Sequence, residues 1–283
     1  MMEIVEDIAE LRRRRLQWRG AGERIALVPT MGNLHPGHLR LIREARSVAD
    51  RVVVSLFVNP MQFDRAEDLA AYPRTLDQDR RSLEGEGVDL LFCPRTPDLY
   101  ARDMGQMSYV EVPGLSATLC GAGRPGHFRG VATVVSKLFN LVQPELAVFG
   151  EKDYQQLILI RRLVEDLNFP VEVVGVPTVR ESDGLAMSSR NGYLSEEERL
   201  RAPALYRVLE ALATRIAAGH QELSGLERSA MAGLRAAGLT PEYVSIRRAE
   251  DLDLPAPGDH RLVILGAAWL GKARLIDNLQ VER

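Results

Sequence analysis

The stretch RIALVPTMGNLHPGHLRLIREARSVADRVVVSLFVNP, residues 24–60, decides the fold of this chain. Its first apolar run, residues 24–30, is short and contains a late proline, which favours a buried strand over a helix. Residues 36–50 carry apolar side chains at helical spacing, and Pro36 suits the first turn of a helix. From residue 51 a nearly continuous apolar run predicts a second buried strand, as in a parallel sheet with helices on both faces. The stretch is therefore predicted to form a βαβ unit.

The same alternation of strand and helix continues to about residue 176. Helices are predicted at about residues 75–84, from residue 131, and at 153–167; strands are predicted from residue 88, at 145–150 and at 171–176. Strands separated by helix-length segments indicate a parallel sheet. We therefore expect an α/β fold, with a Rossmann-like doubly wound parallel sheet in residues 1–176 and a ligand site beyond the carboxyl ends of its strands.

The regular alternation of predicted strands and helices ends at about residue 177. A polar, turn-rich stretch is followed by one long predicted helix at residues 195–218 and a second at 223–237. Strands are predicted at residues 242–249, 261–267 and 273–279. Residues 177–283 are therefore predicted to form a smaller C-terminal α+β domain with an antiparallel sheet.

The N-terminal residues are predicted to form a helix with a short apolar stripe. Ile4, Ile8, Leu11 and Leu16 would make this stripe, and the arginines at positions 12–15 would occupy the remaining faces. This arrangement favours a solvated helix face over a nucleic-acid patch.

Composition narrows the class of protein. The formal net charge is −3, so nucleic acid and anionic membranes are not expected as partners. The two cysteines, Cys93 and Cys120, stand alone, which argues against a disulfide framework or a zinc cluster. The N-terminus lacks a secretory apolar segment and no apolar run is long enough for a membrane span, so we expect a cytoplasmic protein.

The segment PTMGNLHPGHLRL, residues 29–41, joins the first buried strand to its helix. His35 and His38 are three residues apart at the helix start, so both rings can project toward one spot. Gly32 and Gly37 let the backbone approach a ligand, and the free N–H groups favour phosphate. The histidines could instead only cap the helix, or form a metal pair, but no further ligand cluster is apparent and no protein metal site is predicted.

Two other segments offer groups for a polar, anionic substrate. In FVNPMQF, residues 57–63, Asn59 and Gln62 carry neutral amides suited to hydroxyl and carboxylate groups, although the segment alone reads as a turn. In CGAGRPGHFRGVAT, residues 120–133, Arg124, His127 and Arg129 lie in a predicted glycine-rich loop before a helix. The alternative for this second segment is a solvated loop.

FGEKDYQQL, residues 149–157, again lies between a strand and a helix. Lys152 is a mobile point charge for phosphate, while Asp153 suits either a ligand role or the N-cap of the next helix. Of Gln155 and Gln156, at most one is expected to face a ligand, because they project differently from the first turn.

DGLAMSSRNGYLS, residues 183–195, opens the second domain. Ser188, Ser189 and Arg190 are suitable phosphate donors, and a loop between domains can close over a nucleotide. The tripeptide alone is a weak signal.

Taken together, PTMGNLHPGH, FVNPMQF, YPRTL, RPGHFRGVAT, GEKDYQQL and MSSRNGYL resemble the motifs of the pantothenate synthetase (pantoate–β-alanine ligase) family in order and spacing. HPGH, residues 35–38, corresponds to the HIGH-type signature of nucleotidyl-transfer enzymes. The resemblance covers nearly the whole chain. It implies an ATP-dependent ligase that condenses (R)-pantoate with β-alanine to pantothenate through a pantoyl adenylate, releasing AMP and pyrophosphate, with Mg²⁺ and as a cytoplasmic homodimer.

The resemblance also implies residue roles, divided here by ligand. Residues expected to bind ATP are Met31, Gly32, Asn33, Leu34, His35, Pro36, Gly37, His38, Gly150, Glu151, Lys152, Asp153, Val179, Met187, Ser188, Ser189 and Arg190. Within this set His38 is the expected proton donor, and His35, Lys152 and Arg190 are the further catalytic candidates. Gln62 and Gln156 would hold pantoate, and Asn59, Arg124 and His127 complete the predicted substrate set.

Two other functions are compatible with parts of this pattern. A nucleotidylyltransferase shares the HIGH-type fold, but its product keeps the AMP. A non-catalytic nucleotide- or RNA-binding module is the second alternative; the presence of His35, His38, Lys152 and Arg190, and the absence of a basic patch with interleaved aromatic residues, argue against it.

Overall fold

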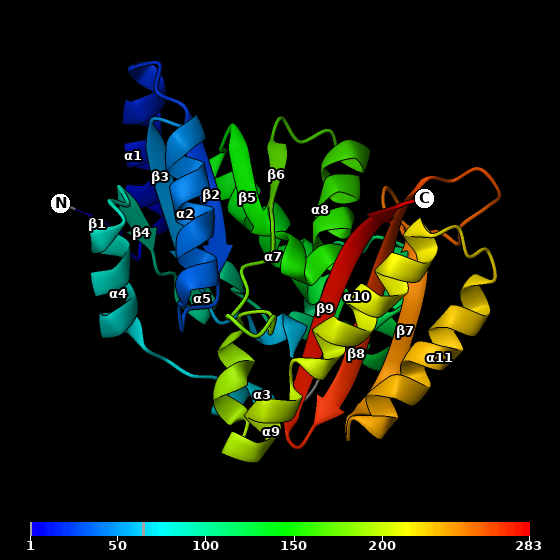
Figure 1. Cartoon of the computed structure of the whole chain (residues 1–283). Coiled ribbons are helices and arrows are strands. Elements are labelled where there is room, and N and C mark those ends of the chain that lie inside the picture. The colour runs from blue at the N-terminus through cyan, green and yellow to red at the C-terminus, as the bar shows by residue number, and fades with distance from the viewer. Residues whose placement is uncertain (1, 64–65) are drawn as a thin grey trace. The chain divides into compact units, whose positions relative to one another are not determined.

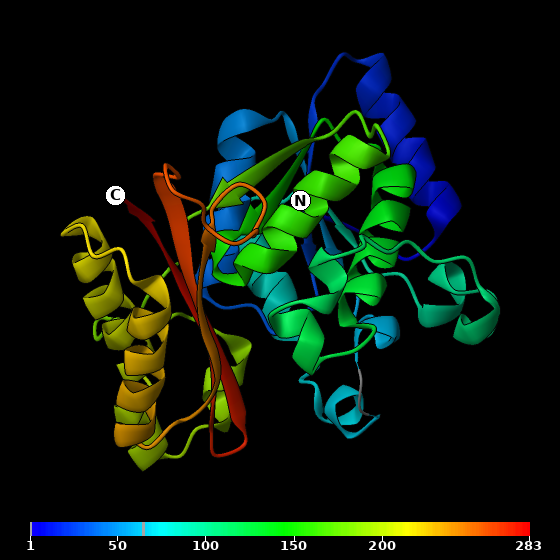
Figure 2. The ribbon, with the colours of Figure 1, turned by 90° about the vertical axis from the view of Figure 1, so that its right-hand side faces the viewer.

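A computed structural model describes residues 2–63 and 66–283 of the chain (Figures 1 and 2). This described part divides into two compact units. The N-terminal unit comprises Met1–Glu151 and Leu159–Pro177, and the C-terminal unit comprises Lys152–Ile158 and Thr178–Arg283. Each unit has its own sheet.

The sheet of the N-terminal unit is parallel throughout. Within the described residues it has six strands, in the order β1-β4-β3-β2-β5-β6. The strands are β1 (Glu3–Val5), β2 (Ile25–Thr30), β3 (Arg51–Leu56), β4 (Leu90–Phe92), β5 (Leu146–Gly150) and β6 (Glu172–Val176). The predicted α/β fold with a Rossmann-like parallel sheet is confirmed.

Helices cover both faces of this sheet. The helices in residues 8–166 are α1 (Ile8–Gly20), α2 (Pro36–Val48), α3 (Ala66–Ala71), α4 (Leu76–Gly85), α5 (Thr96–Leu99), α6 (Cys120–Gly123), α7 (His127–Val142) and α8 (Tyr154–Asp166), and the 3₁₀ turns are η1 (Pro60–Gln62), η2 (Met104–Gln106), η3 (Leu115–Ala117) and η4 (Glu151–Asp153). Figures 1 and 2 show α2 on one side of the sheet and α1 with α7 on the other.

The core of the N-terminal unit follows from the two-residue period of its strands. Val28 and Val54 point to one face, where they meet the buried Ile42 of α2. Ile25 and Leu27 alternate with those positions and are also fully buried, as a sheet with two covered faces requires. The central strands β3, β2 and β5 are neighbours, so the segments that follow them leave the same edge of the sheet.

The C-terminal unit is a small α+β domain in which helices pack on an antiparallel sheet. In its described residues the strands β7 (Thr240–Arg248), β8 (Arg261–Leu270) and β9 (Ala273–Glu282) form a three-stranded antiparallel sheet. Helices α10 (Ala204–Ala217) and α11 (Leu223–Ala236) pack on it around a core that includes Leu209, Leu234 and Ile264 (Figure 2). The short elements α9 (Glu196–Arg201) and η5 (Ser189–Tyr193) precede them.

The prediction for the N-terminal residues is wrong in part. Ile4 belongs to the edge strand β1, and α1 begins at Ile8 after an Asp7 N-cap that accepts the N–H groups of residues 9 and 10. Leu16 is 60% exposed, while Trp18 is buried together with Leu11. The Asp7 cap stops the helix from extending back to Ile4, so the predicted apolar stripe does not exist as one face.

The long helix predicted at residues 195–218 is also wrong. The structure has α9 ending at Arg201 and α10 beginning at Ala204. Pro203 stands at the N-cap of α10 with φ −64°, and it has no N–H to continue the hydrogen bonds of α9. Proline therefore splits the segment, although its apolar spacing continues on both sides.

Among the described residues, no helix is both long and apolar enough to cross a membrane.

Candidate active site

The two histidines after β2 cap helix α2 reciprocally. His35 is the N-cap, and its Nδ1 accepts the N–H of Gly37 at 3.1 Å. Nδ1 of His38 in turn accepts the N–H of His35 at 3.4 Å. The ring centroids are 4.1 Å apart with a tilt of 43°. The pair thus forms a capping box made from imidazoles instead of hydroxyl and carboxylate groups.

This cap fixes the tautomer of both rings. Because each Nδ1 accepts a backbone N–H, its lone pair is used there, and a neutral ring carries its proton on Nε2. Each histidine therefore has an Nε2–H edge turned away from its capping bond, at a helix N-terminus that favours anions. The two histidines can therefore cap the helix through Nδ1 and also act as the predicted donors through Nε2.

A buried carboxylate that the sequence analysis missed holds the loop before these histidines. Asp79 of α4 is 1% exposed, and its two oxygens accept the N–H groups of Asn33 at 2.9 Å and Leu34 at 2.8 Å. Gly32 and Asn33 have φ of 82° and 52°, so a glycine is required before Asn33 for conformational reasons. An acidic residue four positions before the buried Leu83, on one helix face, is the sequence signal that could have identified Asp79.

Replacing Asp79 with asparagine is expected to loosen this loop, because an NH₂ group would then face a backbone N–H. For the ATP-dependent ligase that the sequence resemblance implies, the loss of a charge-assisted acceptor predicts a rise in KM for ATP of about tenfold and a lower Tm, consistent with about 1–3 kcal/mol for an unmet buried group. Steady-state kinetics and thermal unfolding measure both. Asp77→Asn, an exposed change in the same helix turn, is the matched control; equal effects of the two variants would remove Asp79 from this role.

The amides after β3 form a buried network with helix α7. Asn59 donates from Nδ2 to Oε1 of Gln62 and to the carbonyl of Gly130, both at 3.0 Å. Its Oδ1 accepts the hydroxyl of Tyr100 at 2.7 Å and the N–H of Met61 at 3.3 Å. Asn59 is 1% exposed, and both of its side-chain polar atoms have protein partners. Asn59 therefore helps to fix the position of the Gln62 side chain.

Gly130 makes this close approach possible. A Cβ at Gly130 would stand 2.4 Å from the carbonyl oxygen of Met61, well inside van der Waals contact. The first turns of α7 can therefore approach the segment that carries Gln62 only with glycine at this position.

Two predicted substrate residues also contact Gln62 through its main chain. The carbonyl of Gln62 lies 2.9 Å from Nδ1 of His127 and 3.4 Å from Nη2 of Arg124. Nε2 of His127 is 3.2 Å from Nη1 of Arg124, which can only donate, so Nε2 is the acceptor and Nδ1 carries the proton. Helix α7 begins at His127 and not at residue 131, so the segment predicted as a loop is partly helical, and Arg129 pairs with Glu111 at 3.1 Å.

Tyr100 was also missed by the sequence analysis, and it can be tested directly. Burial raises the pKa of its phenol above the ordinary value, so it stays a protonated donor to Asn59 at neutral pH. For the ligase that the sequence resemblance implies, Tyr100→Phe is expected to raise KM for pantoate by about threefold to tenfold, as for one lost buried hydrogen bond, with KM for ATP unchanged. Tyr109→Phe, at a 53% exposed ring, is the control; a Tyr100→Phe enzyme with wild-type KM for pantoate would contradict the assignment.

The remaining predicted ATP residues lie mostly in the C-terminal unit. Lys152 and Ser188 line one hollow there, together with Asn191, Tyr206 and Asp277. Ser188 caps η5 by accepting the N–H of Arg190 at 3.2 Å, and the N–H of Met187 donates to the carbonyl of Val179 at 3.0 Å. The structure therefore brings Lys152 close to the segment that contains Ser188.

The first turn of α8 separates its two glutamines. Gln155 is 3% exposed, whereas Gln156 is half-buried, so the two side chains lie in different surroundings. Asp153 ends η4 directly before α8, and its Oδ2 lies 3.7 Å from Nζ of Lys152. Gly150 and Glu151, in contrast, belong to the N-terminal unit, as do residues 31–38, so the predicted ATP residues are divided between the units.

Two further observations concern the thiol of Cys93 and groups of side chains that could hold a metal ion. Burial raises the pKa of the Cys93 thiol to about 11, which keeps it protonated at neutral pH. In residues 2–63 and 66–283 no group of three or more His, Cys, Asp or Glu side chains is placed to hold a metal ion.

A parallel sheet whose second strand leads through a glycine turn to a histidine-capped helix is typical of α/β enzymes that bind nucleotides. A family model described as pantoate-beta-alanine ligase matches residues 3–280. The chain is 63% identical over 265 residues to pantothenate synthetase of Thioalkalivibrio sulfidiphilus, covering 94% of this chain and 93% of the relative. It is 56% identical to that of Shewanella loihica over the full length of both.

Solved structures agree with this result. The crystal structure of pantothenate synthetase from Thermus thermophilus matches with a TM-score of 0.91 at 48% identity, over 100% of both chains. Pantoate-beta-alanine ligase from Francisella tularensis, complexed with beta-gamma ATP and beta-alanine, matches with a TM-score of 0.83 at 34% identity, over 99% of this chain and 97% of that one. The chain belongs to the pantoate–β-alanine ligase family and is a ligase. The family and enzyme class predicted from the sequence are confirmed.

Proposed function

We propose that this chain joins (R)-pantoate to β-alanine in two steps within one active site. The pantoate carboxylate first attacks the α-phosphorus of ATP, giving pantoyl adenylate and pyrophosphate. The amine of β-alanine then attacks the acyl carbon, giving pantothenate and AMP. The observation that carries this proposal is the reciprocal histidine cap of α2, which offers two Nε2–H donors at a helix N-terminus.

ATP is proposed to bind along residues 31–38 and at the segments that contain Lys152 and Ser188. In the first step negative charge builds on the phosphate oxygens and on the departing pyrophosphate. The donors proposed to meet this charge are His35, His38, Lys152, Ser188, Ser189 and Arg190. Fixed donors are effective here because they need no reorganisation when the charge develops.

His38 is proposed as the main donor to the reacting phosphate. Its Nδ1 is engaged with the backbone of His35, so a proton or hydrogen bond can be given only from Nε2. His35 would act beside it, since the two rings lie in contact.

Pantoate is proposed to bind through the side chains of Gln62 and Gln156. A neutral amide can bond hydroxyl and carboxylate groups without titrating. Asn59, Arg124 and His127 support this site by fixing Gln62 from its side chain and its carbonyl. Their role in substrate binding is thus proposed to be indirect.

Mg²⁺, which the sequence resemblance implies, would bind together with the nucleotide and would neutralise negative charge on its phosphates. Oxygen ligands from the triphosphate suit this ion, and the described side chains contain no cluster that would hold it independently.

We further propose that the protein is a cytoplasmic homodimer. Residues 1–176, which contain the parallel sheet, would be the ATP- and pantoate-binding domain. Residues 177–283 would be the domain that carries the MSSR loop, residues 187–190.

The function is tested by following pyrophosphate and product mass with purified protein, ATP and Mg²⁺. Pyrophosphate release should depend on pantoate, and pantothenate with free AMP should appear only after β-alanine is added. A product that keeps the AMP when β-alanine is present would indicate a nucleotidylyltransferase, and release without pantoate would refute the assigned substrate.

A further inference from the structure

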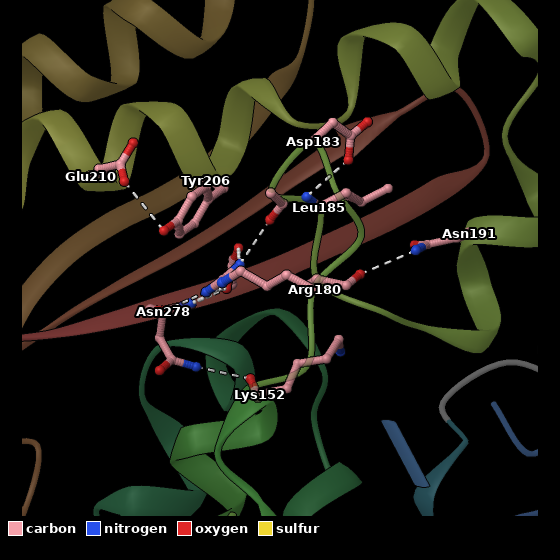
Figure 3. A network of polar contacts seen from close by, with 11 residues as sticks. Lys152, Arg180, Asp183, Leu185, Asn191, Tyr206, Glu210 and Asn278 are labelled. Carbon is pink, nitrogen blue, oxygen red and sulfur yellow. Dashed lines mark hydrogen bonds and ion pairs between the residues drawn. The ribbon is translucent and has the colours of Figure 1, made fainter. Parts of the chain in front are cut away.

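A buried ion pair in the C-terminal unit lies next to the segments proposed to bind ATP. Arg180 donates from Nη1 to Oδ2 of Asp277 at 2.6 Å and from Nη2 to Oδ1 at 2.9 Å, a bidentate arrangement (Figure 3). The side chain of Asp277 is 3% exposed and that of Arg180 is 17% exposed. The guanidinium also lies over the ring of Tyr206, 3.9 Å from its centroid. Groups from separate parts of the unit therefore fix this one side chain.

Arg180 also closes the hairpin that leads into the MSSR loop. Its Nη1 donates to the carbonyl of Gly184 at 3.1 Å, and its backbone forms an antiparallel bridge with Ala186. Gly184 has φ +92°, and a Cβ there would stand 2.5 Å from the Tyr206 ring. Residues 179–187 are thus held in one tight conformation directly before Ser188.

The residue after Asp277 contacts the second ATP segment. Asn278 donates from Nδ2 to the carbonyl of Lys152 at 3.0 Å, and its own carbonyl accepts Nη2 of Arg180 at 3.3 Å. Adjacent residues of a strand point to opposite faces, so the dipeptide 277–278 of β9 can contact both segments at once. Lys152 makes one of these contacts with its own carbonyl, Ser188 follows Ala186 by two residues, and both side chains line the same hollow.

We infer that Arg180 and Asn278 are positioning residues. Through their hydrogen bonds at β9 they fix the Lys152 segment and the MSSR loop in place next to each other. This inference rests on the proposed function, since it gives the two segments a shared ligand. A buried ion pair contributes little net stability compared with apolar packing, so its bidentate geometry points to orientation. Arginine is needed for that geometry, because lysine is a single point charge.

The test compares Arg180→Lys and Asn278→Leu with the wild-type enzyme. Arg180→Lys keeps the positive charge but cannot form the bidentate hydrogen bonds to Asp277. Asn278→Leu keeps a side chain of similar size but removes the amide that donates to the carbonyl of Lys152. Each is expected to raise KM for ATP or lower kcat so that kcat/KM for ATP falls about tenfold, with KM for pantoate within twofold of wild type. Tm is measured for each variant.

Arg248→Lys is the matched control, because Arg248 also forms a fork with a carboxylate, that of Asp251, in the same unit. It should leave both KM values unchanged. If kcat/KM for ATP stays within twofold in both test variants, or if both substrates are affected equally with a drop in Tm, the inference is wrong. A wild-type enzyme without pantoate-dependent turnover would instead refute the proposed function.

Discussion

Replacing His38 with alanine is expected to slow pantoate-dependent pyrophosphate release by about 10²-fold or more, as for the loss of a transition-state donor. The reason is that the substitution removes the Nε2–H of His38, the proposed donor, together with Nδ1, which caps α2. Single-turnover measurement of pyrophosphate isolates this step from the attack of β-alanine.

The cap itself must be separated from the chemistry, because losing a helix cap costs about 1 kcal/mol of stability. His38→Asn places an amide oxygen near the position of Nδ1 and removes Nε2, so it should be as slow as the alanine variant with a higher Tm. His220→Ala, at an exposed histidine, is the control. A folded His38→Asn enzyme with the wild-type rate would exclude His38 from the mechanism.

Lys152→Ala is expected to have the second largest effect, a loss of about 10²-fold in the rate of adenylate formation, because a charge aimed at phosphate oxygens is removed. KM for pantoate should change much less. Lys152 is 17% exposed and its carbonyl is held by Asn278, so its segment should keep its place without the ammonium group. Rapid-quench measurement of pyrophosphate and pantoate titration provide the two values.

Lys272→Ala, at an exposed lysine in the turn between β8 and β9, is the control for this variant. A selective loss of pantoate affinity in Lys152→Ala, with the rate of adenylate formation intact, would contradict the phosphate role.

The parallel sheet was predictable because its strands are marked locally. The apolar runs of β2 and β3 and the helical spacing of α2 are encoded within short windows, and both faces of the sheet are buried, so the pattern is strong. β1 was missed because three residues are too few for a pattern, and its strand pairing depends on β4, which is far along the chain. The break at Pro203 was missed because apolar spacing continues across it, although proline is a local signal.

The candidate site was predictable where side chains follow strands, as with His35, His38 and Gln62. The residues that support them were not. Asp79 bonds the loop at Asn33 and Leu34 from a different helix, and Tyr100 reaches Asn59 across 41 positions. Such contacts depend on the tertiary structure. The helical spacing of Asp79 and Leu83 places both on one face of α4, but it does not show which backbone groups the carboxylate would bond.

Activation of the acid as an adenylate is the central claim, and transfer of an oxygen atom tests it directly. Pantoate labelled with ¹⁸O in its carboxylate is incubated with ATP, Mg²⁺, β-alanine and the enzyme, and the products are analysed by mass spectrometry. Attack on the α-phosphorus followed by cleavage of the acyl–oxygen bond predicts one labelled oxygen in AMP and none in pyrophosphate. Formation of ADP with the label in released phosphate would show activation as an acyl phosphate, and unlabelled AMP with the label in pyrophosphate would show attack on the β-phosphorus; either result would contradict the claim.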